Sequence, residues 1–86
     1  MNIFQQDTHT IAAEVLSKMA RFTGRHIVYV REDGRVQMER EGREKLARVG
    51  DSDIVGCYTR DSDPADVAED LEARSREVIQ LREIMR

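Results

Sequence analysis

The chain has 86 residues, 40% of them hydrophobic and 36% charged, which is typical of one small globular domain spanning residues 1–86. Its 17 acidic and 14 basic residues leave a formal charge of −3, which argues against a general nucleic-acid binder because such proteins need a basic face. The sequence contains no long apolar run, no secretory signal and only one cysteine. We therefore expect a protein that makes no membrane contact and lies in a reducing cytoplasm. If a phage encodes the chain, this cytoplasm is the cytosol of the host.

The first predicted element is a helix over residues 8–22. Asp7 and Thr8 offer side chains that can cap its first turn. Apolar residues then recur on one helical face: Ile11, Val15, Leu16, Met19 and Phe22. Gly24 is expected to end the helix, because glycine readily adopts the left-handed conformation at a C-cap.

Residues 25–40, RHIVYVREDGRVQMER, predict a β-hairpin of β-branched and alternating apolar residues. A two-residue turn would pair Tyr29 with Met38. A three-residue loop over residues 32–34, with Gly34 left-handed, would instead pair Val30 with Val36. We expect the second register, because it gathers four apolar side chains on one face. These are Val28, Val30, Val36 and Met38.

A third strand is predicted around residues 54–58, after an ambiguous segment, residues 41–50, that is either a helical turn or an ordered loop. Alternation places Val55 and Cys57 on one face of this strand and Ile54 and Tyr58 on the other. Gly56 indicates a bulge or a close backbone approach. Cys57 is expected to be buried and unreactive among apolar neighbours.

The last element is a helix from residue 64 to about residue 85. Asp63 is its expected N-cap, Pro64 takes the first helical position and Asp66 follows in the first turn. The apolar stripe of this helix consists of Val67, Leu71, Val78, Leu81 and Met85. The fold class is therefore α+β: a three-stranded antiparallel sheet with two helices on one face, in α-β-β-β-α order, with a long C-terminal helix.

Carboxylates gather around the start of this last helix. They are Asp51, Asp53, Asp61, Asp63, Asp66, Glu69 and Asp70. Favourable interaction with the positive end of the helix explains most of the cluster without any ligand. The excess predicts an acidic surface that binds a protein partner with a basic surface. The spacing does not fit a calcium-binding loop, so we expect no metal.

No motif predicts catalysis. His9 and His26 have no second ligand at metal-binding spacing, no serine lies in a nucleophile elbow, and no glycine-rich loop suits a phosphate. We therefore expect no enzymatic activity, no catalytic residues and no cofactor.

Two apolar surfaces favour recognition of another protein. If the hairpin register is right, Ile27, Tyr29, Ile54 and Tyr58 lie together on the open face of the sheet, where tyrosines are typical interface anchors. The alternatives are that another loop covers this face or that the third strand has the opposite register. The end of the last helix offers Val78, Leu81 and Met85 as a candidate dimer helix, because the helix is long for so small a sheet. The alternative is that this stripe simply packs on the sheet.

The sequence thus favours a non-enzymatic module that acts by stoichiometric occlusion of a partner. A small acidic protein of this kind resembles in profile the phage or mobile-element inhibitors, anti-CRISPR proteins among them, that block a host nucleic-acid-handling complex. An alternative is a homodimeric regulatory or structural subunit joined through the C-terminal helix.

A third hypothesis is RNA or DNA binding through the basic residues of positions 21–48. The second helix begins DPADVAED, however, and its negative charge repels phosphates. These basic residues are Arg21, Arg25, Arg31, Arg35, Arg40, Arg43, Lys45 and Arg48.

Overall fold

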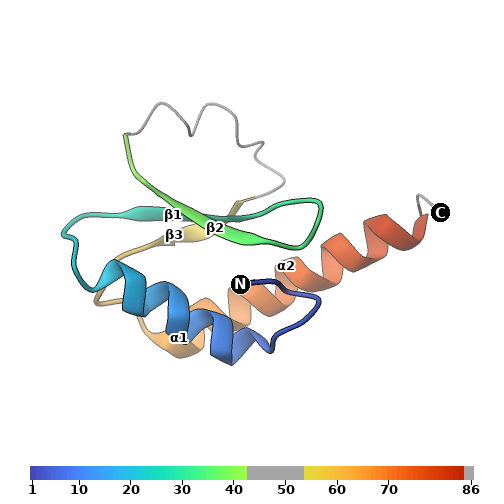
Figure 1. Cartoon of the computed structure of the whole chain (residues 1–86), viewed down its shortest axis with the longest axis horizontal. Coiled ribbons are helices and arrows are strands. Elements are labelled where there is room, and N and C mark those ends of the chain that lie inside the picture. The colour runs from blue at the N-terminus through green and yellow to red at the C-terminus, as the bar shows by residue number, and fades with distance from the viewer. Residues whose placement is uncertain (43–53, 85–86) are drawn as a thin grey trace.

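The computed structural model describes residues 1–42 and 54–84. Its elements are α1 (Thr8–Met19), β1 (His26–Val30), β2 (Val36–Arg40), β3 (Ile54–Tyr58) and α2 (Pro64–Ile84). This order confirms the predicted α+β class and the long C-terminal helix (Figure 1). The ambiguous residues 43–50, Asp51, Asp53 and Met85 lie outside the described residues.

The sheet has the order β2-β1-β3 and both pairings are antiparallel. Figure 1 shows α1 and α2 on the same face of this sheet, as the sequence predicted. Because β1 is the central strand, β2 and β3 each keep one outer edge. Neither α1 nor α2 combines the length with the sustained apolar run that crossing a bilayer requires.

The predicted hairpin register is confirmed, since Val30 pairs with Val36 and Val28 pairs with Met38. Two backbone bonds close the loop: Arg31 N–H donates to Arg35 O at 2.8 Å, and Gly34 N–H donates to Arg31 O at 2.9 Å. Gly34 has φ 87°, the left-handed value that the loop requires. A Cβ at this position would also collide with the Phe4 ring, so both the backbone conformation and the lack of space require glycine.

The core lies between the helices and one face of the sheet. The side chains with the least exposure are Ile11, Val15 and Met19 of α1, Val28 and Val30 of β1, and Val67 and Leu71 of α2. Met38 and Val78 pack against this cluster while remaining partly exposed. Each helix therefore contributes the apolar stripe that its sequence predicted, except at its C-terminal end.

Helix α1 begins as predicted and ends earlier. Asp7 caps it by accepting a hydrogen bond from His9 N–H at 2.7 Å, and this bond lowers the pKa of Asp7. The predicted end at residue 22 is wrong: the helix stops at Met19, and Ala20 N–H donates to Ser17 O at 3.3 Å in a tightened last turn. Phe22 then leaves the helical face and is 40% exposed.

Phe22 lies beside the C-terminal end of β2 instead of extending the α1 stripe. Its ring centroid lies 5.8 Å from that of His26, and the Arg40 guanidinium lies 5.0 Å from the Phe22 centroid. Gly24, with φ 92°, belongs to the connection into β1, so its predicted role as helix cap is also wrong. The four residues between the helix end and Gly24 let the chain reverse onto the sheet.

Candidate functional site

Three of the four residues predicted for the open sheet face do lie there. Tyr29 pairs with Ile54 across β1 and β3, and Ile27 pairs with Cys57, all on the side opposite the buried Val28. The Tyr29 hydroxyl donates to Gln37 Oε1 at 2.9 Å, which ties the face to β2. Burial, with a smaller contribution from Glu39, raises the pKa of Tyr29.

Tyr58, the fourth predicted residue, is on the opposite face, and that prediction is wrong. It is 7% exposed, and its hydroxyl donates to Asp70 Oδ2 of α2 at 2.7 Å. The reason is a β-bulge: the pairing of β1 with β3 shifts register between Val28 and Tyr29. The extra residue changes which side chains alternate onto the helix side.

The bulge also reverses the prediction for Cys57. Its side chain is exposed, where the sequence predicted a buried thiol. Cys57 pairs with Ile27 on the open face, whereas Gly56 pairs with Val28 and lies beneath the Tyr58 ring. Val55, its predicted face-mate, packs partly buried against the core.

The described part of the acidic surface lies on and beside the solvent side of α2. Its members Asp61, Asp63, Asp66, Glu69 and Asp70 are all exposed. Asp63 Oδ1 accepts from Ala65 N–H at 2.9 Å and caps the helix, while Asp70 holds Tyr58. Asp66 lies in the first turn, next to the positive helix end.

Asp61 and Glu69 have no comparable structural task. Glu72, an exposed carboxylate that the sequence reasoning did not assign to this surface, adds to it. Over residues 1–42 and 54–84, no lysine or arginine forms an ion pair with any of these six carboxylates. Arg74 bonds instead to Glu77 Oε2 at 2.8 Å and Ile54 O at 2.7 Å. This stretch of α2 therefore presents negative charge that the described residues do not neutralise.

The C-terminal end of α2 carries the main exposed apolar surface. Ile79 is 41% exposed, Leu81 57% and Ile84 80%. Figure 1 shows why: α2 continues well past the sheet, so its last turns have nothing of the described chain to pack against. Of the three predicted dimer-helix residues, Val78 is partly buried against the core and Leu81 is exposed. The sequence predicted an exposed end of α2, because its apolar stripe is longer than the small sheet can cover.

Two of the five predicted basic residues that the structure describes are paired with carboxylates. Arg25 bonds to Glu41 through two hydrogen bonds of 3.0 and 2.6 Å, which raises the pKa of Arg25 and lowers that of Glu41. Arg35 lies 3.4 Å from Asp33. Arg43, Lys45 and Arg48 lie outside the described residues. Arg21, Arg31 and Arg40 are exposed and form no ion pair within the described residues.

Within residues 1–42 and 54–84, no three His, Cys, Asp or Glu side chains come together in a group that could hold a metal ion. His26 is buried, and its Nδ1 has no hydrogen-bond partner there, nor has the Ser75 hydroxyl. No known protein family matches the chain, and neither a curated protein nor a solved structure shows significant similarity to it.

Proposed function

We propose that this protein is a non-enzymatic binding module whose exposed side of α2 docks on a partner protein with a basic surface. One observation carries the proposal. The first half of this helix bears carboxylates that form no ion pair with any described lysine or arginine, and its end exposes Leu81 and Ile84. Such a helix offers charge for steering and apolar area for burial.

Charge complementarity defines the partner. Six carboxylates that lie within twelve consecutive positions of the sequence attract lysine and arginine side chains and repel other acidic surfaces. A protein that handles nucleic acid exposes just such a basic surface, because it must bind phosphates. Stoichiometric occlusion of that surface is the mode of action that we propose. Inhibition of a host nucleic-acid-handling complex by a phage or mobile-element protein, as anti-CRISPR inhibitors do, is the finer form of this proposal.

The test is capture of a partner from a lysate by immobilised protein in four forms. These are the wild type, the charge-neutral variant Asp61→Asn/Glu69→Gln/Glu72→Gln, the variant Leu81→Asp, and the control Glu32→Gln, which removes an exposed carboxylate of the hairpin loop. We expect one protein to be retained by the wild type and the control and lost by both α2 variants and at high salt. Retention of the same proteins by all four forms would refute the proposal.

A homodimer joined through the end of α2 is the second candidate, because Ile79, Leu81 and Ile84 form an exposed apolar end without needing any charge. Light scattering separates the two proposals. A dimer that persists at high salt and becomes a monomer in Leu81→Asp favours self-assembly. A monomer at all salt concentrations favours a different protein as the partner of α2.

A further inference from the structure

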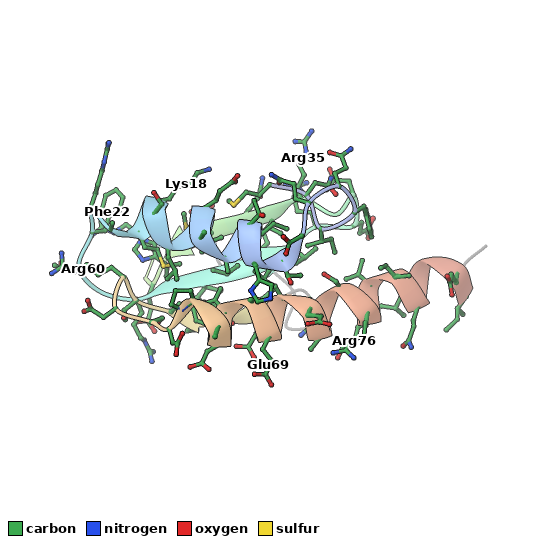
Figure 2. The ribbon with its side chains drawn as sticks, turned by 90° about the horizontal axis from the view of Figure 1, so that it is seen from below. Lys18, Phe22, Arg35, Arg60, Glu69 and Arg76 are labelled. Carbon is green, nitrogen blue, oxygen red and sulfur yellow. The ribbon has the colours of Figure 1, made fainter. Side chains whose placement is uncertain are left out.

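The outer edge of β2 borders a hollow that the proposal for α2 does not use. The hollow has a volume of about 780 Å³ and is lined by N-terminal residues, by Lys18 of α1 and by residues 35–39. Figure 2 shows Lys18 and Arg35 on one side of the molecule and Glu69 and Arg76 of α2 on the other. The hollow is therefore a separate surface.

The N-terminal residues already extend the sheet at this edge. Val36 N–H donates to Met1 O at 3.0 Å, and Ile3 N–H donates to Gly34 O at 2.9 Å. Asn2 and Arg35 form an antiparallel bridge between these two bonds. Residues 1–3 thus act as a very short fourth strand, which pairs with the start of β2 and ends at Val36.

The rest of the β2 edge keeps its hydrogen-bonding groups pointing outward. Arg31 N–H donates to Arg35 O at 2.8 Å, and Glu41 N–H donates to Arg25 O at 3.0 Å, so odd-numbered residues of this segment bond toward β1. Backbone bonding directions alternate along a strand, and hence the N–H and C=O of Met38 point away from β1. No hydrogen bond from residues 1–42 or 54–84 reaches these two groups.

We propose that this edge binds an extended segment of a partner protein as an added strand, antiparallel to β2 and in line with residues 1–3. A residue of the added strand exchanges two main-chain bonds with Met38, which supplies affinity. A carboxylate on the helix side of that strand meets Lys18, which is exposed and has no ion-pair partner among the described residues. Lys18 thereby selects an acidic segment.

The probe is a seven-residue peptide with alternating valine and threonine around one central glutamate, compared with the same peptide carrying lysine. We expect the glutamate peptide to shift the amide resonance of Met38 and slow its exchange, and to bind about threefold more tightly than the lysine peptide, as for an exposed ion pair. The preference reverses in Lys18→Glu and is retained in the control Lys18→Arg.

Met38→Pro is the matched backbone test. Proline removes the outward N–H, which takes no part in the ladder with β1, and an edge strand tolerates it there. Loss of peptide binding by a folded Met38→Pro supports the proposal. Should this variant fail to fold, exchange of the Met38 amide in the wild type decides alone. Four results would each overturn the proposal of an added strand. Met38→Pro binds the peptide unchanged, the amide shifts are confined to α2, or neither peptide binds. The fourth is protection of Met38 that depends on the concentration of the free protein, which would mean that a second copy occupies the edge.

Discussion

The Tyr58 hydroxyl donates a hydrogen bond of 2.7 Å to Asp70 Oδ2, and this bond joins the end of β3 to the solvent-exposed acidic side of α2. Tyr58 is buried and Asp70 is exposed, so the bond links the core to the proposed binding surface. The bond also gives Asp70, one of the residues predicted for the acidic surface, a structural role. Asp61, Glu69 and Glu72 have no such structural role within the described residues and remain available to a partner.

Tyr58→Phe removes that bond without emptying the site, so we expect a loss of about 1 kcal/mol in the free energy of unfolding at neutral pH. Burial, then the bond to Asp70, raises the pKa of Tyr58 in the folded protein. The stability linked to this proton is therefore fully present below pH 10.0, the ordinary value, and is lost as pH rises above it. Urea unfolding at pH 8 and pH 11 measures both effects.

The two variants of the tyrosines give the control for that experiment. Tyr29 and Tyr58 are the two tyrosines of the chain, and both have raised pKa values. Tyr58→Phe should weaken the alkaline loss of stability more than Tyr29→Phe does, because Tyr58 is the more buried. Equal alkaline losses in the wild type and Tyr58→Phe would show that the hydroxyl is not held as described.

Gly56→Ala tests the bulge of β3. A Cβ at Gly56 would lie 2.7 Å from Cζ of Tyr58, closer than real contacts allow. The ring is buried and bonded to Asp70, so it cannot simply move away, and we expect a cost of about 1–3 kcal/mol. A double-mutant cycle with Tyr58→Leu should show a smaller cost of Gly56→Ala. Additive costs would mean that the ring does not lie over Gly56.

Leu71→Ala and Leu81→Ala separate the two halves of the α2 stripe. Leu71 is fully buried, so its truncation should cost about 2–5 kcal/mol. Leu81 is 57% exposed, and its truncation should change the free energy of unfolding by less than about 0.5 kcal/mol. Equilibrium denaturation gives both numbers. A large cost at Leu81 that grows with protein concentration would instead indicate a dimer.

Cys57 should react with a thiol reagent in the folded protein, because its side chain is exposed on the open sheet face. We expect one equivalent of thiol per chain to react in the absence of denaturant, and Cys57→Ser to give no signal. If Cys57 reacts only in urea, its side chain is buried, as simple strand alternation predicts, and the exposed position is wrong.

The difference between the hairpin and β3 shows how far the sequence can be read. The β1–β2 register follows from a short loop and two apolar pairs, and a slip by one residue would expose Val28. In β3 the alternation is broken by a bulge, and a bulge depends on how three strands and α2 pack together. Gly56 was its only local signal.

The same limit applies at the helix ends and at the surface. Asp63 and Pro64 predict the start of α2 correctly because capping is local. Phe22 fits the α1 stripe by spacing, yet it lies against His26 and Arg40, a contact between distant segments. The short fourth strand of residues 1–3 could not be predicted from the sequence either, since three residues show no periodicity.

The most direct test of the central proposal, that the exposed side of α2 docks on a partner, is site-specific photo-crosslinking in the lysate. A photoreactive residue is placed at position 69 or 81 of α2, or at position 32 of the hairpin loop as the control. We expect positions 69 and 81 to attach to the same protein in a one-to-one complex and position 32 not to attach. A complex that crosslinks from position 32 but from neither position of α2 would contradict it.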